Sequence, residues 1–286
     1  MRVLGVANRP TDWHCGRFRL SLERPLVMGV INVTPDSFSD GGRFLAPAAA
    51  LDHARQLIAE GADILDIGGE STRPGAALVS PADQIERVLP VVRALSDVTI
   101  PLSVDTSEPE VMRAALSEGV AIINDVRALS VPGAMGQMAR SDCGVVLMHM
   151  QGNPQTMQAD PSYEDVVAQV GDFLRKRRDE VVQAGVAPDR IALDPGFGFG
   201  KRGAHNRSLL ARLQELTALG QPLLVGLSRK ASLGEMTGRA VDQRLVASVV
   251  AALLAIQSGA RIVRVHDVAA TRDAIAVWEA VRQEQS

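Results

Sequence analysis

Two carboxylates and one carboxamide stand where three short apolar runs of the chain end. They are Asp105, Asn124 and Asp194, and we expect the three strands that they end to be close neighbours. Together such groups offer fixed acceptors and donors, which suit the edge of a heterocycle that carries an amine, ring N–H groups and a carbonyl. Each residue alone could equally be a helix N-cap, because Asp and Asn are favoured there. A metal site made by the three is less favoured, because no His or Glu shares their spacing.

Basic side chains gather late in the chain, in the run Ser228, Arg229, Lys230 and in the pair Arg264 and His266. The members of that pair are two residues apart in a predicted strand, so they project from one face. Guanidinium, imidazole and ammonium groups together fit the oxygens of a diphosphate. Lys230 leaves a second chemistry open, the Schiff base of a barrel aldolase.

Two polar loops follow the first two apolar runs. Residues 32–42 exceed the usual length of about 2 to 6 residues, which predicts a lid that closes over substrate. In residues 66–75, glycines permit close backbone approach, while Thr72 and Arg73 supply a hydroxyl and a guanidinium suited to phosphate. Ordinary turns remain the alternative for both loops.

The sharpest local pattern is the run 194–201, where three glycines alternate with two phenylalanines before Lys201. This run suits neither helix nor strand, and it lacks the order of a dinucleotide-binding fingerprint. Four phenylalanines lie in glycine-rich loops: Phe38, Phe44, Phe197 and Phe199. We expect these rings to be exposed and to stack on, or close over, a flat ligand.

The elements that must position these groups are eight strand-sized runs rich in Val, Ile and Leu. They span residues 26–33, 63–68, 100–105, 120–125, 143–149, 190–194, 222–228 and 261–266. Helix-like stretches alternate with them, which predicts parallel βαβ units and a (β/α)₈ TIM barrel, an α/β fold. We expect one domain over residues 1–286, with residues 1–25 as an extension packing on the barrel. The polar strand ends would then converge on one cleft, with phosphate near the last two strands.

Two residues after the fifth run stay less defined. Met148 is expected to form a pocket wall, whereas His149 is undecided between capping the strand and belonging to the site.

Bulk composition limits the class of partner. The net charge is −3 with mixed acidic and basic residues, which argues against nucleic acid and a polybasic membrane surface. No apolar run is long enough to span a bilayer. Two distant cysteines favour a reducing, cytoplasmic location. Small molecules are therefore the expected partners.

Taken together, the motifs resemble those of the dihydropteroate synthases, pterin-binding TIM-barrel enzymes of folate biosynthesis. Four segments carry the resemblance in the family's order: 32–42, 69–75, 194–201 and 226–230. The resemblance covers residues 26–268. It implies condensation of p-aminobenzoate with (7,8-dihydropterin-6-yl)methyl diphosphate to 7,8-dihydropteroate and diphosphate, with Mg²⁺ as cofactor, in a cytoplasmic homodimer that sulfonamides target.

The resemblance also implies roles for particular residues. The pterin edge would be held by Asp105, Asn124, Asp194 and Lys230, with Arg264 against the ring. The diphosphate would face Asn32, Thr72, Arg73, Arg264 and His266, and Asn32 would help to place Mg²⁺. The p-aminobenzoate side would be lined by Phe38, Pro74, Phe199 and Ser228. The residues expected to be catalytic are Asp105, Asp194, Lys230, Arg264 and His266.

One departure concerns p-aminobenzoate. Where family members commonly carry Ser after the Ser-Arg-Lys run, this chain has Ala231 followed by Ser232, so affinity for p-aminobenzoate and for sulfonamides is open. Ser232 or backbone N–H groups of the next helix could substitute. A catalytically inactive pterin-binding paralogue is therefore the alternative function. A pterin-binding methyltransferase is disfavoured, because it has no use for the predicted diphosphate cluster.

The resemblance implies a dimer contact through helices late in the chain. Residues 246–256 are apolar enough to contribute, or could equally be the inward face of a barrel helix.

Overall fold

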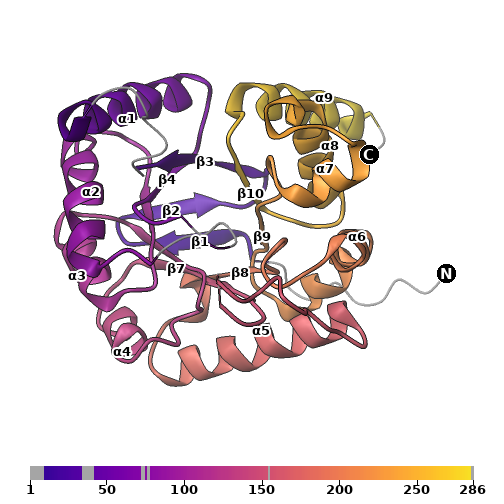
Figure 1. Ribbon diagram of the computed structural model, residues 1–286, viewed down its shortest axis with the longest axis horizontal. Coiled ribbons are helices and arrows are strands. Elements are labelled where there is room, and N and C mark those ends of the chain that lie inside the picture. The colour runs from indigo at the N-terminus through magenta and orange to yellow at the C-terminus, as the bar shows by residue number, and fades with distance from the viewer. Residues whose placement is uncertain (1–9, 34–41, 72–74, 76–77, 154, 285–286) are drawn as a thin grey trace.

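Eight parallel strands form the centre of the protein, inside a ring of helices (Figure 1). The computed structural model describes residues 10–33, 42–71, 75, 78–153 and 155–284. The strands of the ring are β3 (Leu26–Asn32), β4 (Ile64–Gly68), β5 (Leu102–Asp105), β6 (Ile122–Asp125), β7 (Gly144–Met148), β8 (Ile191–Asp194), β9 (Leu224–Val225) and β10 (Ile262–Val265). Each lies within one of the predicted runs, so the TIM-barrel prediction is confirmed.

The sheet closes on itself between its first and last strands. Strands pair in the order β8-β7-β6-β5-β4-β3-β10-β9. A parallel bridge joins Leu193 of β8 to Leu223, and the N–H of Leu193 donates to the carbonyl oxygen of Pro222 at 2.9 Å. Strand β9 is much shorter than its predicted run, because the chain turns sharply after Leu227, whose carbonyl oxygen accepts from the N–H of Lys230 at 3.2 Å.

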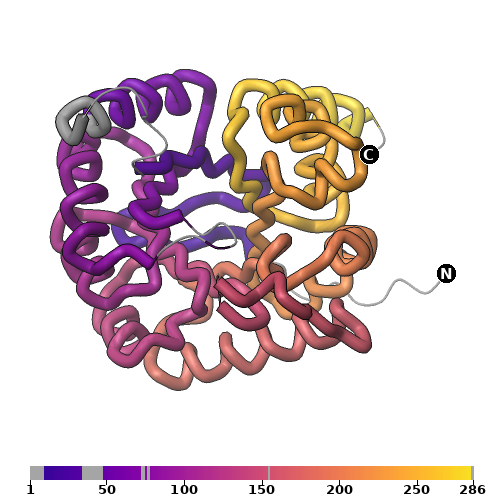
Figure 2. The backbone as a smooth tube through the Cα atoms, viewed as in Figure 1, coloured from indigo at the N-terminus to yellow at the C-terminus, as the bar shows by residue number. Residues whose placement is uncertain are grey.

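Helices alternate with the strands and cover the outside of the barrel (Figure 2). The α-helices are α1 (Gly42–Ala59), α2 (Pro81–Ala94), α3 (Pro109–Ser117), α4 (Ala134–Ala139), α5 (Val166–Gln183), α6 (Gly203–Ala211), α7 (Ala231–Thr237), α8 (Leu245–Gln257) and α9 (Val268–Gln283). The 3₁₀ turns are η2 (Pro188–Arg190), η3 (Leu213–Leu219) and η4 (Val241–Gln243). No described helix is both long enough and apolar enough to cross a bilayer.

Helix α2 shows why these segments are helical. Ser80 caps its N-terminus by accepting from the backbone N–H of Asp83 at 3.1 Å. Val88 and Val91 lie one turn apart and are buried against the sheet. Capping and one apolar face together hold the helix on the barrel.

A hairpin closes the N-terminal end of the barrel. It consists of β1 (Asp12–Cys15) and β2 (Phe18–Ser21), which pair antiparallel. Trp13 is fully buried, and its indole N–H donates to the carbonyl oxygen of Arg190 at 2.9 Å. Inward side chains from the strands complete this apolar cluster: Leu26, Met28, Ile64, Ile122, Val146, Ala192, Leu224 and Ile262. The described part of the N-terminal segment therefore fills the end of the barrel opposite the polar strand ends.

Candidate functional site

Arg264 of β10 lies at the centre of a polar network inside the C-terminal end of the barrel. Its Nε donates to Asp66 at 2.6 Å and its Nη2 donates to Asp105 at 3.1 Å. The amide of Asn124 also donates to Asp66, at 3.1 Å. Asp105 and Asn124 are register partners on β5 and β6. The fully buried Asp66 thus links two of the predicted pterin residues, Asn124 and Arg264. Its position at a strand end had predicted only that it would face the cleft.

The carboxyl group of Asp105 is hard to ionise. Burial raises the pKa of Asp105 to about 7, even though Arg264 favours the charged form. The opposing charges act on Arg264 as well: burial lowers its pKa, and Asp66 and Asp105 more than offset that effect. Such competing shifts are typical of sites built for chemistry.

Asp194 ends β8, which is not adjacent to the strands of this pair. Strand β7 separates β8 from β6, so the expectation that three strand ends adjoin is correct for Asp105 and Asn124 and wrong for Asp194. Its register partner is Met148. Burial raises the pKa of Asp194, while Lys230 and the N–H of Gly196, at 2.7 Å, favour the carboxylate. Acceptors therefore face the interior from strands that are not adjacent.

Lys230 is directed into the barrel by a strained turn. Arg229 has φ +58, a left-handed conformation that is costly for a residue with a side chain. Its backbone N–H donates to Ser248 at 2.9 Å, and its guanidinium pairs with Asp267. Two fixed contacts thus hold the turn that places Lys230.

The ammonium of Lys230 lies over the 194–201 loop. It donates to the carbonyl oxygen of Phe197, and it is 4.6 Å from the ring centroid of Phe199. Burial lowers the pKa of Lys230 to about 8, against the attraction of Asp194. The ammonium is therefore a hydrogen-bond donor beside an acceptor and an aromatic face.

The glycine-rich loop 194–201 is tightly folded. Gly196, Gly198 and Gly200 have φ of +69, +80 and +61, which glycine adopts without strain. Phe197 is fully buried in the main core, so the prediction that it is exposed was wrong. Phe199 is also largely buried, in a cluster with Val126, Met148 and Met157. The alternating pattern arises because one ring anchors the loop while the other faces the interior.

Ser228 and His266 meet beside the last strand. The backbone N–H of His266 donates to the Ser228 hydroxyl oxygen at 3.2 Å, and its Nδ1 lies 3.0 Å from the same atom. The resemblance had assigned the two residues to different substrates, p-aminobenzoate and diphosphate. Their contact puts both at one boundary of the site.

Several predicted site residues lie outside the described residues. They are Phe38, Thr72, Arg73 and Pro74, together with the side chain of Phe44. Asn32 is described: it ends β3, beside Gly68 of β4, and a Cβ added to Gly68 would lie 3.9 Å from the Asn32 Oδ1 atom. An amide oxygen can be a ligand of Mg²⁺ when phosphate oxygens supply other ligands. Asn32, at the end of β3, therefore fits the role of a Mg²⁺ ligand.

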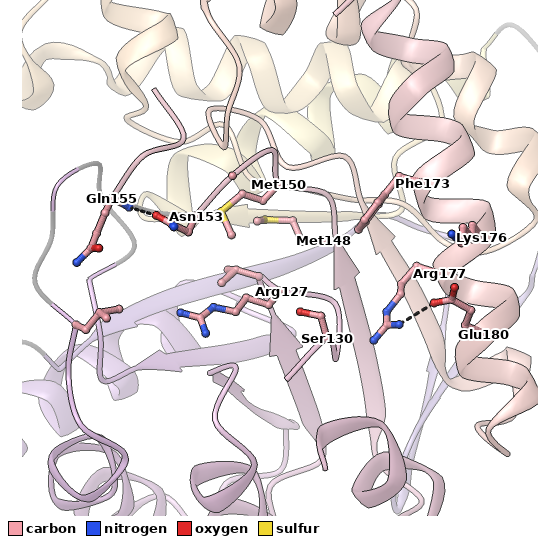
Figure 3. A pocket seen from close by; sticks show the side chains of 13 residues that line it. Arg127, Ser130, Met148, Met150, Asn153, Gln155, Phe173, Lys176, Arg177 and Glu180 are labelled. Atoms are coloured by element: carbon pink, nitrogen blue, oxygen red, sulfur yellow. Dashed lines mark hydrogen bonds and ion pairs between the residues drawn. The ribbon is translucent and has the colours of Figure 1, made fainter. Parts of the chain in front are cut away.

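A lateral cavity of about 550 Å³ lies beside the ends of β6 and β7, against α5 (Figure 3). Met148 and Met150 lie on one side of it, and Phe173 and Arg177 extend from the helix. Among its described lining residues, Met148 is the member of the predicted site. Met148 therefore lines this lateral cavity and also packs in the cluster that contains Phe199.

Sequence reasoning left His149 undecided and gave Lys201 no role. In the structure they are partners: the Nζ atom of Lys201 lies 2.9 Å from Nδ1 of His149, and both residues are buried. Burial, assisted by the Lys201 charge, lowers the pKa of His149 to about 3, so its ring is neutral. The positions of both in strand-end loops were the only signal in the sequence.

Comparison with known proteins places this barrel in a defined class. Residues 28–266 match the family described as pterin binding enzymes. Dihydropteroate synthase from Neisseria meningitidis serogroup B is 53% identical over 276 residues, covering 94% of this chain and 97% of that protein.

Two solved structures agree with the sequence match. Xanthomonas albilineans dihydropteroate synthase with 4-aminobenzoic acid has a TM-score of 0.91 at 52% identity, over 96% of this chain and 98% of that one. The Burkholderia cenocepacia enzyme complexed with 7,8-dihydropteroate has a TM-score of 0.89 at 49% identity, over 98% and 99%. The chain therefore belongs to the pterin-binding enzymes and, within them, to the dihydropteroate synthase family. Nothing in these comparisons supports an inactive paralogue.

Proposed function

We propose that the protein condenses p-aminobenzoate with (7,8-dihydropterin-6-yl)methyl diphosphate, giving 7,8-dihydropteroate and diphosphate. The observation that carries this proposal is the set of groups facing the barrel interior from two parts of the barrel: Asp105 and Asn124 in one, Asp194 and Lys230 in the other. Carboxylates accept from the amine and ring N–H groups of a pterin, while an ammonium and a carboxamide donate to its carbonyl and ring nitrogens.

In this proposal the carboxylates also assist the chemistry. When the bond between the pterin methylene carbon and the diphosphate oxygen breaks, its electron pair leaves with diphosphate and the pterin ring gains positive charge. Asp105 and Asp194, inside a poorly solvated barrel, stabilise that charge through N–H groups of the ring. The amine of p-aminobenzoate then forms the new C–N bond and loses a proton, so no protein nucleophile is needed.

The departing diphosphate would lie at the His266 side of the barrel mouth. His266 would supply a donor there, in keeping with the phosphate preference of the last strands of TIM barrels. Thr72 and Arg73, which lie outside the described residues, are proposed as further donors. Arg264 is held by Asp66 and Asp105, so we assign it mainly to the pterin ring. Asn32 would hold a Mg²⁺ ion, which when bound neutralises charge on the diphosphate oxygens.

The p-aminobenzoate side would be formed by Phe199 and Ser228 with the loop residues Phe38 and Pro74. Phe199 presents a ring beside Lys230, which suits an aromatic substrate next to the pterin. A Yersinia pestis dihydropteroate synthase has been solved with a sulfonamide drug, and sulfonamides would compete with p-aminobenzoate for this surface. The hydroxyl oxygen of Ser232 is buried without a hydrogen-bond partner among the described residues, so Ser232 or backbone N–H groups would substitute for the missing hydroxyl at Ala231.

We further propose a homodimer in the cytoplasm. Helix α8 carries exposed apolar side chains on its outer surface: Leu245, Val246, Val250 and Leu254. A contiguous apolar helix face is more stable when it is covered by another protein surface. Sedimentation equilibrium tests this directly: a dimer is expected, and Val246→Glu should yield monomers.

The synthase proposal is tested by incubating purified protein with Mg²⁺, p-aminobenzoate and the pterin diphosphate. Dihydropteroate and diphosphate should form in equal amounts. Tight pterin binding without product would overturn the proposal.

A further inference from the structure

Lys201 is a buried lysine inside the loop that carries Asp194 and Phe199. Its side chain is only 2% exposed. The ammonium lies 2.9 Å from the carbonyl oxygen of Gly196, 3.1 Å from that of Phe199 and 2.9 Å from Nδ1 of His149. A buried ammonium is costly unless every donor is satisfied, and these three acceptors match its three N–H groups.

The loop conformation depends on these contacts. The carbonyl oxygens of Gly196 and Phe199 both accept from the buried ammonium. That of Gly196 also accepts from the backbone N–H of Phe199 at 3.1 Å, so the turn and the ammonium share one acceptor. Neighbouring backbone leaves no room for adjustment, since a Cβ at Gly196 would lie 1.9 Å from the carbonyl oxygen of His149 and one at Gly200 would lie 2.5 Å from that of Gln151. The ammonium therefore acts as a fixed centre around which the loop is wrapped.

His149 orients Lys201 as a neutral acceptor. Burial lowers the pKa of Lys201 to about 7. Below that pH the amine is an ammonium with only donors, so Nδ1 of His149 carries the lone pair and Nε2 the proton. The ring meets Phe173 edge to face, with centroids 4.9 Å apart. A rigid imidazole thus fixes the ammonium from the β7 side.

We propose that Lys201 is a positioning residue for the synthase reaction, holding the 194–201 loop so that Asp194 and Phe199 face the two substrates. This inference rests on the proposed function. Lys201 acts through the loop and is not expected to touch either substrate. It also supplies a second positive charge, besides Lys230, that favours the ionised form of Asp194.

The effect of the Lys201 charge on the pKa of Asp194 has a direction that can be measured. The charged groups that act on Asp194 are Lys230, Lys201 and Arg264. Burial raises the pKa of the Asp194 carboxyl, and each of these cations lowers it. If Asp194 works as a carboxylate, activity falls as pH drops through that pKa. Removing the Lys201 charge moves the acid limb of the pH profile to higher pH.

The other acidic group that bears on the profile is Asp105, whose pKa burial raises to about 7. The charges that act on it include Arg264, Asp66, Asp125, Glu70 and Lys230. Lys201 interacts chiefly with the charges of Asp194 and Lys230, so a shift caused by Lys201 reports on Asp194.

The test compares kcat/KM for the pterin diphosphate, and its pH profile, in wild type, Lys201→Met and Lys201→Arg. Lys201→Met keeps the length of the side chain but removes charge and donors. We expect kcat/KM to fall about 10- to 100-fold, as for loss of a buried charge-assisted hydrogen bond, with the acid limb shifted to higher pH. Lys201→Arg keeps the charge, but its planar head cannot reach all three acceptors. Its kcat/KM should also fall, with the limb unmoved.

Lys176→Met is the matched control, because Lys176 is an exposed lysine on α5; it should behave as wild type. Melting curves confirm folding. Unchanged kcat/KM in folded Lys201→Met would overturn the positioning role, and a lowered kcat/KM with an unmoved limb would overturn the role of its charge. Should Lys201→Met not fold, Lys201→Arg decides, and unchanged kcat/KM there overturns the proposal. An inactive wild type would instead overturn the proposed function.

Discussion

The two ends of the barrel interior differ although the same strands build both. Ile64 and Asp66 are two residues apart on β4, and Ile262 and Arg264 are two residues apart on β10. In each pair the first side chain belongs to the apolar cluster under the hairpin, and the second belongs to the polar network. Successive inward-facing residues of one strand, two positions apart, thus belong to the apolar end and to the charged end of the barrel.

This difference shows which end of the barrel contains features that lower the stability of the fold and serve ligand binding. The apolar cluster under the hairpin satisfies its one buried indole donor. Beside it, the buried guanidinium of Arg190 donates to the carbonyl oxygens of Cys143 and Met138. At the opposite end, carboxylates are buried with raised pKa values, Arg229 has positive φ, and a lysine is enclosed in a loop. Also there, Oδ1 of Asp66 and Oγ of Ser103 are buried without a hydrogen-bond partner among the described residues. Such features stabilise little and are expected where a ligand binds.

The largest effect at the charged end is expected for Asp194→Asn. It removes the carboxylate charge while keeping shape, so kcat/KM should fall about 10²- to 10³-fold, as for loss of a preorganised electrostatic contact. Steady-state kinetics measure it, with Asp172→Asn, at an exposed aspartate of α5, as control. Unchanged kinetics would remove Asp194 from its assigned role.

At the hairpin end the effects should be reversed. Trp13→Ala removes a fully buried side chain and should lower the free energy of unfolding by about 3–5 kcal/mol. Denaturant titration measures this loss. Well below the melting temperature, kcat/KM should stay within about twofold, since Trp13 is far from the polar strand ends. A large kinetic defect in the folded variant would mean that the two ends are coupled.

The pH dependence of stability sharpens the contrast at a single carboxyl. The pKa of Asp105 is raised from 3.8 to about 7 in the folded protein. The folded state therefore binds the proton more tightly, and stability is lost as pH rises between about 4 and 7. In Asp105→Asn this loss is absent, so its melting temperature relative to wild type should be higher at pH 8 than at pH 4. A difference that is constant with pH would contradict the burial argument.

The smallest effect is expected at Ala231. If neither Ser232 nor backbone groups replace the hydroxyl, Ala231→Ser should lower KM for p-aminobenzoate about 2- to 10-fold, the value of one hydrogen bond. Sulfonamide inhibition should strengthen in parallel. Equal KM values in the two proteins would show that the serine is dispensable here.

The sequence predicted the barrel well because each strand is a short apolar run that ends in a polar residue. It did not predict the hairpin, although polar and apolar side chains alternate in residues 12–15 and 18–21, on either side of Gly16 and Arg17. Two segments of four residues are a short signal beside the longer apolar runs of the barrel. It placed Phe197 on the surface because glycine-rich runs are usually exposed loops. In the structure, three positive φ values fold that run tightly enough to bury the ring.

The candidate site was predicted only as far as residue types allow. The sequence pattern identified Asp105, Asn124 and Asp194 by their positions at strand ends, but it contains no distances between them. Lys201 was given no role because lysines are rarely buried. Asp66 was given no specific role because its function depends on hydrogen bonds to two distant residues, Asn124 and Arg264. Buried ion pairs depend on contacts between distant segments, which no local pattern contains.

The central claim is that the pterin binds at the charged end of the barrel interior. A crystal structure of the protein with pterin diphosphate and p-aminobenzoate tests this most directly. We predict pterin N–H groups within hydrogen-bond distance of Asp105 and Asp194, with the ring between Arg264 and Met148. A pterin bound instead in the lateral cavity beside α5 (Figure 3), with those carboxylates uncontacted, would contradict the account.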